Sequence, residues 1–333
     1  IRSHTRLPGQ AGVGETAAMS PTVPFVRRID HGPHPELLDA LRRHLPEFQV
    51  VEHAELPVEQ RAAVTVAIVD GPSGEQLAAL PNLALVQSTW AGIEEILPAV
   101  PDGVAIARMV DPQLAATMAE AVLAWTLFLH RDMPRYARQQ RARVWKEHAL
   151  VKAEHRRIGI VGLGALGRAA ARSLVQQGFP VTGWSRSPKA LAGVECLHGA
   201  DGLSGLLERS DIVVNLLPRT ESTDGLLDAA AFATMPSGAA LINFGRGQTV
   251  DDAALLDALD SGHLDHAVLD VFDVEPLPSE HRYWSHDAVT VLPHISGPTS
   301  TDTAAVIAAD NVRRFLESGE LPTDALVDRA RGY

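Results

Sequence analysis

A strand pattern, a glycine-rich loop and a helix pattern follow one another within residues 156–178. The stretch reads RRIGIVGLGALGRAAARSLVQQG, and its loop glycines are Gly162, Gly164 and Gly167. The first glycine permits a tight turn, the second lets a pyrophosphate approach the backbone, and the third lets helix and strand pack closely. The helix N-terminus, at Ala165 and Leu166, directs free N–H groups at phosphate oxygens. This order predicts a parallel α/β sheet that binds a dinucleotide.

The next predicted strand ends without the acid that usually accepts hydrogen bonds from the adenosine ribose hydroxyls. Its sequence, VTGWSRSPK, instead places Ser185, Arg186, Ser187 and Lys189 there. A guanidinium can bind a phosphate through two hydrogen bonds, whereas an acid would repel it. We therefore expect NADP(H) to be preferred, with NAD(H) possible. The alternative is a solvated basic turn that has lost its acid.

Short apolar runs alternate with helical patterns along most of the chain. Strands are predicted at 25–29, 48–52, 64–69, 83–89, 104–108, 158–161, 211–218, 239–244, 266–272 and 289–293, and helices at 35–45, 74–81 and 299–316. A helical stretch over 115–145 should bend or break at Pro134. The predicted fold is α/β, with two doubly wound parallel-sheet (Rossmann-like) domains joined by a long helix.

A chain of 333 residues is long for one hydrophobic core, so two domains are expected. Residues 1–18 are rich in glycine and polar residues and precede Met19, which indicates a disordered expression leader or an upstream extension outside the fold. We assign residues 19–117 and 299–333 to a substrate domain and residues 118–298 to a dinucleotide-binding domain.

Charge and composition exclude several classes of partner. A formal net charge of -12 argues against nucleic-acid binding, even though a basic run extends from Arg131 to Lys146. The longest apolar run, 121–129, is too short for a membrane span. Cys196 is the only cysteine, so no intrachain disulfide can form and a cytoplasmic location is expected.

Three polar residues follow three predicted strands of the second half, where ligands bind in an open parallel sheet. They are Arg246 after LINFG, Glu275 after LDVFDV and His294 after VTVLP. Hydride addition to a ketone builds negative charge on its oxygen, which an imidazolium can neutralise by donating a proton. We expect His294 to be that acid, Glu275 its partner, and Arg246 to hold the substrate's carboxylate or carbonyl.

Each of these residues also has a structural interpretation, as a salt bridge, a loop acid before Pro276 or a buried histidine. Their joint placement at strand ends of a dinucleotide fold favours catalysis. The pairs His31 and His34, and His263 and His266, have no carboxylate or cysteine at ligand spacing. We expect these histidines to lie in solvated loops and expect no metal.

The sequence resembles the D-2-hydroxyacid dehydrogenase family, and within it the glyoxylate/hydroxypyruvate reductase A branch. The matching stretches are VGLGALG, WSRSPKALAGV, VVNLLPRTEST, MPSGAALINFGRG, ALDSGHLDHAVLDVFDVEPLP and YWSHDAVTVLPHIS. They extend over residues 157–296, and a looser match covers 80–121. The resemblance implies a hydride-transferring enzyme in which Arg246, Glu275 and His294 have the roles given above.

The resemblance also implies roles for further residues. Asp270 would help to hold the nicotinamide carboxamide, and Leu217 and Pro218 would line the cofactor groove. The backbone N–H groups of Ala91, Gly92 and Ile93 would bind the substrate carboxylate. The basic segment after residue 130 resembles the arm through which members of the family form homodimers.

Three positions depart from the usual family pattern. Gly245 stands where alanine is common, Leu292 where threonine is common, and Trp90 where many members have a small residue. Trp90 either covers the substrate pocket or is a core aromatic. These departures concern substrate choice more than chemistry.

The sequence thus predicts an NADPH-dependent reductase of small 2-oxo acids, glyoxylate or hydroxypyruvate first. A dehydrogenase for a bulkier 2-hydroxy acid is an alternative within the same class. A non-catalytic, corepressor-like sensor of NAD(P)H is an alternative from another class, because such proteins share the fold and the three polar residues.

Overall fold

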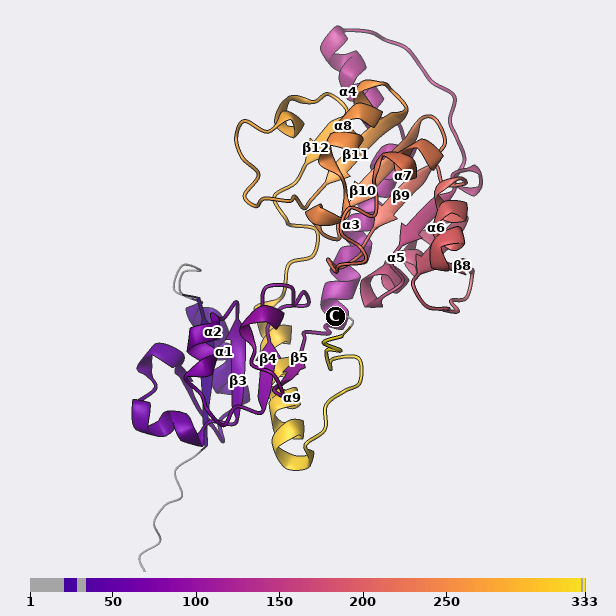
Figure 1. The fold of residues 1–333 in the computed structure, drawn as a ribbon. Coiled ribbons are helices and arrows are strands. Elements are labelled where there is room, and N and C mark those ends of the chain that lie inside the picture. The colour runs from indigo at the N-terminus through magenta and orange to yellow at the C-terminus, as the bar shows by residue number, and fades with distance from the viewer. Residues whose placement is uncertain (1–20, 29–33, 331, 333) are drawn as a thin grey trace, which may run out of the picture.

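The computed structural model describes residues 21–28, 34–330 and 332. The predicted leader and His31 lie outside the described residues. Two α/β lobes are connected by helix α3 (Pro112–His130) and by the chain that leads into helix α9 (Thr301–Ser318) (Figure 1). The chain thus crosses between the lobes twice, and each lobe contains one sheet.

The first sheet contains five parallel strands in the order β2-β1-β3-β4-β5. The strands are β1 (Thr22–Arg27), β2 (Gln49–Glu52), β3 (Val66–Asp70), β4 (Leu85–Ser88) and β5 (Ala105–Ala107). Helices α1 (Pro35–His44) and α2 (Gly74–Ala78) connect strands, and α2 begins with a capping box between Ser73 and Gln76. The strands β2 to β5 overlap the apolar runs that predicted them, whereas β1 begins three residues before the predicted run 25–29.

Helix α9 returns to this first lobe and completes its core. Its buried face, Ala305, Ala308, Ala309 and Val312, packs in one apolar cluster with strands of the sheet and with α1. Asn311 Nδ2 donates to Gln87 Oε1 at 2.9 Å in the same buried layer. Small residues on α9 let it approach closely, which gives the predicted C-terminal helix its packing partner.

The second sheet contains seven parallel strands in the order β12-β11-β10-β9-β6-β7-β8. The strands are β6 (Ile158–Val161), β7 (Val181–Ser185), β8 (Val194–His198), β9 (Ile212–Asn215), β10 (Ala239–Asn243), β11 (Leu264–Leu269) and β12 (Val289–Val291). The connecting helices are α5 (Ala165–Gln176), α6 (Gly199–Leu207), α7 (Ala229–Thr234) and α8 (Asp252–Asp260). The strand order reverses beside β6, where doubly wound sheets bind their ligands. The predicted fold class is confirmed; the partly exposed edge strand β8 was not predicted.

The long helical stretch is broken, as predicted, just before Pro134. Helix α3 ends at His130, Asp132 adopts a left-handed backbone with φ 54°, and α4 (Met133–Ala142) restarts with the proline in its first turn. α3 is long and apolar enough to span a membrane by length and composition only. In this fold it packs along α5 and against the second sheet. The exact domain division at residues 117 and 298 stays a prediction.

Short 3₁₀ turns complete the described secondary structure. They lie at His53–Glu55, Val58–Ala63, Leu97–Ala99, Ala153–His155, Gly247–Thr249 and Arg282–Ser285. Gly247–Thr249 directly follows Arg246, and Arg282–Ser285 precedes β12.

The expectation of a solvated loop was wrong for His266. This residue lies on β11 and is only 3% exposed, and its Nε2 lies 2.9 Å from Thr290 Oγ1 on β12. Burial lowers the pKa of His266 to about 4, so it is a neutral core residue at neutral pH. The half-buried His263 bonds to the Phe232 carbonyl.

Candidate active site

The glycine loop has the backbone geometry that its spacing predicted. Gly162 has φ +110°, a conformation that side chains with a Cβ rarely adopt. A Cβ built on Gly167 would lie 1.8 Å from the Gly162 carbonyl oxygen, so only glycine permits this approach of helix to strand. A Cβ on Gly164 would meet nothing within 4 Å. Backbone N–H groups at the start of α5, from Ala165 and Leu166 onward, thus have open space in front of Gly164, where a pyrophosphate can bind.

The end of β7 presents the polar cluster predicted from VTGWSRSPK. Ser185 is buried, and its Oγ donates to the carbonyl of Ser187 at 2.8 Å, which tightens the turn. Arg186, Ser187 and Lys189 are exposed on this turn. Arg186 also lines a cavity between the two lobes. The turn therefore directs positive charge to the site that the ribose of a bound dinucleotide takes in this fold.

Arg246 follows β10 and is held by a buried polar network. Thr249 Oγ1 donates to the Arg246 carbonyl at 2.6 Å, and Asn243 Nδ2 donates to the same oxygen at 3.2 Å. Asn215 Nδ2 donates to both Asn243 Oδ1 and Thr249 Oγ1. Buried amides cost free energy unless they are paired, so this network fixes the backbone around Arg246. In the sequence, this network was indicated by an asparagine at the end of each of two buried strands, Asn215 after β9 and Asn243 after β10.

Glu94, which the sequence analysis did not single out, holds the Arg246 side chain from the other lobe. Arg246 Nε lies 3.1 Å from Glu94 Oε1, and Arg246 Nη2 donates to Oε2 at 3.3 Å. The Arg219 backbone N–H also donates to Glu94 Oε1, at 3.3 Å. One carboxylate therefore connects the first lobe to two loops of the second lobe. The position of Glu94 directly after the Trp90–Ile93 segment could have indicated its role from the sequence.

The predicted carboxylate-binding loop touches Arg246 directly. A Cβ built on Gly92 would lie 1.9 Å from Arg246 Nη2, so the guanidinium packs against bare backbone. Among the described residues, the backbone N–H groups of Ala91, Gly92 and Ile93 have no hydrogen-bond acceptor. N–H donors and a guanidinium that meet in this way suit a small carboxylate.

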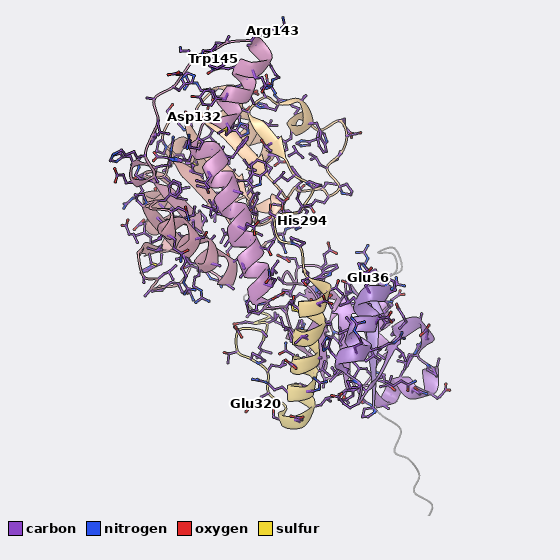
Figure 2. The ribbon with its side chains drawn as sticks, turned by 180° about the vertical axis from the view of Figure 1, so that it is seen from behind. Glu36, Asp132, Arg143, Trp145, His294 and Glu320 are labelled. Carbon is purple, nitrogen blue, oxygen red and sulfur yellow. The ribbon has the colours of Figure 1, made fainter. Side chains whose placement is uncertain are left out.

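His294 and Glu275 meet as predicted. His294 Nδ1 lies 2.7 Å from Glu275 Oε2, while Glu275 Oε1 accepts from the Phe272 N–H at 2.9 Å. His294 has φ +54°, a left-handed conformation that costs an L-residue about 1–2 kcal/mol. Figure 2 shows His294 on the side of its lobe that faces the other lobe. The imidazole is half-exposed, with its Nδ1 edge taken by the carboxylate.

The pair raises one pKa and lowers the other. The hydrogen bond to Glu275 raises the pKa of His294, and the carboxylate charge adds to this, against burial and the Arg246 charge. Burial alone would raise the pKa of Glu275, but the hydrogen bonds from His294 and Phe272 N–H outweigh it and lower that pKa. Both shifts favour an imidazolium–carboxylate pair.

Asp270 lies at the end of β11 and holds the turn that follows His294. Its Oδ1 accepts from the Ile295 N–H at 2.7 Å and its Oδ2 from the Ser296 N–H at 2.9 Å. The carboxylate is buried, so these bonds stabilise both its charge and the strained backbone of His294. A carboxamide contact by Asp270 would use the remaining acceptor capacity of its oxygens.

Trp90 is held in place by hydrogen bonds within the first lobe. Its indole Nε1 donates to Asp70, its backbone N–H donates to Ser88 Oγ at 2.8 Å, and its carbonyl accepts from Met109. The ring is partly buried against the apolar cluster of the first sheet. Trp90 thus supports the Ala91–Ile93 loop from the side, whichever role it has toward a substrate.

The loop after β9 and the loop after β10 approach closely. A Cβ on Gly245 would lie 2.6 Å from the Leu217 carbonyl oxygen, so the alanine common in the family would fit here only if the backbone shifted. Leu217 is buried and Pro218 is partly exposed beside it. Leu292, the other departure, packs at the margin of the core under α3.

The structure therefore brings the predicted residues to one edge of the second sheet, facing the Ala91–Ile93 loop of the first lobe. No group of three or more histidine, cysteine or acidic side chains suited to a metal occurs in the part of the chain that the structure describes. A glycine loop at a topological switch point and a carboxylate-paired imidazole define an NAD(P)-dependent oxidoreductase.

Comparison with known proteins gives the family. The family described as D-isomer specific 2-hydroxyacid dehydrogenase, NAD binding domain, matches residues 123–296. Glyoxylate/hydroxypyruvate reductase A of Photorhabdus laumondii subsp. laumondii is 38% identical over 274 residues, 80% of this chain and 87% of that protein. The protein of the same name from Serratia proteamaculans is 37% identical over 305 residues, 90% of this chain and 96% of its own. The chain belongs to the D-isomer specific 2-hydroxyacid dehydrogenase family.

Solved structures agree with this assignment. A D-isomer specific 2-hydroxyacid dehydrogenase from Xanthobacter autotrophicus Py2, in complex with NADPH and MES, superposes with a TM-score of 0.87 at 40% identity, covering 94% of this chain and 100% of that chain. An NADPH-dependent glyoxylate/hydroxypyruvate reductase from Sinorhizobium meliloti, in complex with NADP and sulfate, gives 0.84 at 34% identity, covering 94% and 99%. The predicted family and two-domain fold are confirmed.

The glycine loop offers a matched pair of substitutions. Gly167→Ala places a methyl group against the Gly162 carbonyl and should lower the free energy of unfolding by about 1–3 kcal/mol or more. Gly164→Ala has room and φ −72°, so its stability should stay near that of the wild type. Its methyl group should nevertheless weaken dinucleotide binding. Thermal unfolding and fluorescence titration with NADPH measure both effects; equal melting temperatures, or full NADPH affinity in Gly164→Ala, would contradict them.

Glu94→Gln should lower kcat/KM for a 2-oxo acid about 10- to 100-fold, the range expected for losing charge-assisted hydrogen bonds. The amide keeps the shape of the carboxylate but not the charge that aligns Arg246. Steady-state kinetics with saturating cofactor measure the effect. Glu95→Gln is the control, because Glu95 is exposed and pairs only loosely with Arg28 at 3.6 Å. Equal kinetics of the two variants would show that Glu94 does not position Arg246.

Proposed function

We propose that this protein is an NADPH-dependent reductase of small 2-oxo acids of the glyoxylate/hydroxypyruvate type, with His294 as the proton donor. The observation that carries the proposal is the 2.7 Å contact between His294 Nδ1 and Glu275, on the edge where Arg246 meets the Gly92 loop. This arrangement places His294, a proton donor whose pKa is raised, beside the Arg246 site that suits a carboxylate.

In this proposal the residues of the chain orient the substrate and supply the proton. A bound reduced nicotinamide dinucleotide supplies the hydride. Arg246 and the N–H groups of Ala91–Ile93 hold the carboxylate of the acid, which places the ketone beside His294. As the C=O bond gains a hydride at carbon, His294 donates its proton to the oxygen and the product is a 2-hydroxy acid. Glu275 stabilises the imidazolium before the transfer.

The preference for NADP(H) is supported by the turn after β7, where Arg186, Ser187 and Lys189 stand in place of an acid. The relatives from Xanthobacter autotrophicus and Sinorhizobium meliloti were solved with NADPH and NADP. The preference for small acids is supported by the names of the relatives and by the direct contact of Gly92 with Arg246.

We further propose that the protein is a cytoplasmic homodimer that uses α4 and the segment after it as an arm. Trp145 is 97% exposed and lies near the tip of this arm (Figure 2). Val144 and Leu150 are also exposed. Apolar side chains in such a position suit a protein contact better than water.

The test is NADPH oxidation, followed by absorbance, with glyoxylate, hydroxypyruvate, pyruvate and phenylpyruvate, each repeated with NADH. We expect the fastest turnover with one of the two small acids and NADPH. His294→Ala should lower kcat about 10²- to 10⁴-fold, the usual contribution of a general acid, and leave NADPH affinity nearly unchanged.

Each other outcome identifies the part that fails. Faster turnover of phenylpyruvate would favour a bulkier substrate. Tight NADPH binding without turnover of any acid would favour a sensor of NAD(P)H. Wild-type turnover by His294→Ala would exclude His294 as the proton donor.

The pH dependence of reduction should follow the protonation of His294. Reduction needs the imidazolium, so its rate is full below the pKa of His294 and falls as the pH rises through it. Because Glu275 raises that pKa, Glu275→Gln should move the fall to lower pH. Profiles of kcat against pH for both proteins measure the shift, and Glu280→Gln, an exposed acid of the same loop, is the control. Coincident profiles of Glu275→Gln and wild type would contradict the pairing.

A further inference from the structure

A cavity of about 630 Å³ opens between the two lobes. Three parts of the chain form its walls. The first lobe contributes Glu94 and Leu97, the second contributes Arg186 and residues 219–222, and the C-terminal tail contributes Arg329, Ala330 and Gly332. The cavity thus lies beside the ends of β7 and β9, where an adenosine ribose is bound in this fold.

Three guanidinium groups line this cavity, although the chain as a whole has a net charge of -12. They are Arg186, Arg219 and Arg329, and they come from three different segments. The carboxylates in the lining are Glu94, which is bound to Arg246, and Glu221. A site of this composition favours an anion.

Among the described residues, the Arg219 guanidinium has only one weak partner, so most of its N–H donors can bind a ligand. Its Nε donates to Asp224 at 3.3 Å, but both side chains are about half-exposed, and such surface pairs contribute little. The hydroxyls of Thr220 and Ser222, 3.1 Å apart, follow it in the same wall. The backbone of Arg219 is fixed by the bond from its N–H to Glu94.

Arg329 belongs to the opposite lobe and keeps its charge. Its guanidinium donates to the carbonyls of Val100, Pro101 and Val104, which are neutral acceptors. The carboxylate paired with it, Asp102, is fully exposed and lies 3.8 Å away, so that pair contributes little. These bonds fasten the C-terminal tail to the first lobe. The tail then reaches the second lobe, since a methyl group built on Gly332 would lie 3.4 Å from Thr220 Cγ2.

We propose that this cavity binds the 2′-phosphate of the dinucleotide, with Arg219 as a second phosphate ligand beside Arg186 and Arg329 supplying positive charge from the other lobe. The inference rests on the proposed preference for NADP(H). A phosphate monoester carries a charge of about −1.5 to −2 near neutral pH, which suits several guanidinium groups. Because the arginines come from both lobes, the same phosphate would bind the lobes together at the adenosine end, as Glu94 does at Arg246.

The experiment uses two ligands that differ only in the 2′-phosphate: adenosine 2′,5′-bisphosphate and adenosine 5′-monophosphate. Calorimetric titration of the full chain gives the ratio of their affinities. We expect Arg219→Gln to reduce this ratio about tenfold, as the loss of a charge-assisted hydrogen bond would, and Arg219→Lys to reduce it less. Arg209→Gln is the matched control, because Arg209 pairs with Glu195 outside the cavity lining.

A second pair of variants tests the contribution from the other lobe. Arg329→Gln should reduce the ratio of the two affinities more than Arg329→Lys does. Both variants lose the guanidinium that binds the carbonyls of the first lobe, but only Arg329→Gln also loses the positive charge. Equal ratios in these two variants would limit the site to the second lobe and overturn the role of Arg329.

The outcomes separate this inference from the proposed function. If Arg219→Gln lowers the affinity for both ligands equally, or for neither, while Arg186→Gln lowers the ratio, Arg219 is not a phosphate ligand and the NADP(H) preference stands. If the wild type binds both ligands equally, the preference for NADP(H) fails as well.

Discussion

All strands within each sheet are parallel, so the carboxyl ends of neighbouring strands share one edge. This constraint places the loops after β6, β7, β9, β10, β11 and β12 on the same side of the second sheet. Residues more than a hundred positions apart, such as Gly162 and His294, therefore belong to one surface. The first lobe then supplies a backbone loop, Ala91–Ile93, that touches this surface at Arg246. The proposed chemistry depends on this contact between the sheet edge and the loop.

His294 shows how the fold holds a strained residue at this edge. Its left-handed backbone is unfavourable for an L-residue, and two bonds from the following N–H groups to Asp270 hold the turn in place. Glu275, fixed by the Phe272 N–H, then takes the Nδ1 edge of the ring. The buried carboxylate of Asp270 thus contributes to the site through backbone geometry, which no spacing in the sequence indicates.

The two lobes are joined by more than the covalent connections. Asp111 caps the start of α3 and its Oδ2 accepts from Thr303 at the start of α9 at 2.6 Å, which ties the two crossing segments to each other. Glu94 connects the first lobe to Arg246 and Arg219, and the C-terminal tail reaches Thr220. A change in the angle between the lobes would move Glu94, and it would therefore also move the Arg246 side chain that Glu94 holds.

The sequence by itself determined the sheet class, the glycine loop, the basic turn after β7 and the three polar residues at strand ends. These are local patterns, since one backbone conformation or one strand end is encoded within a few residues. The pairing of His294 with Glu275 was also predictable, because both follow strands of one parallel sheet. The break at Pro134 followed from the proline ring.

Only the tertiary structure decided which residues from separate segments meet. Glu94 with Arg246, the network of Asn215, Asn243 and Thr249, and the cavity with Arg186, Arg219 and Arg329 each join segments far apart in the chain. The buried position of His266 depended on α3 lying over β11, so its sequence neighbours could not reveal it. Such contacts are set by how close two backbones pack, as Gly245 against Leu217 shows, and a sequence pattern carries no distance between segments.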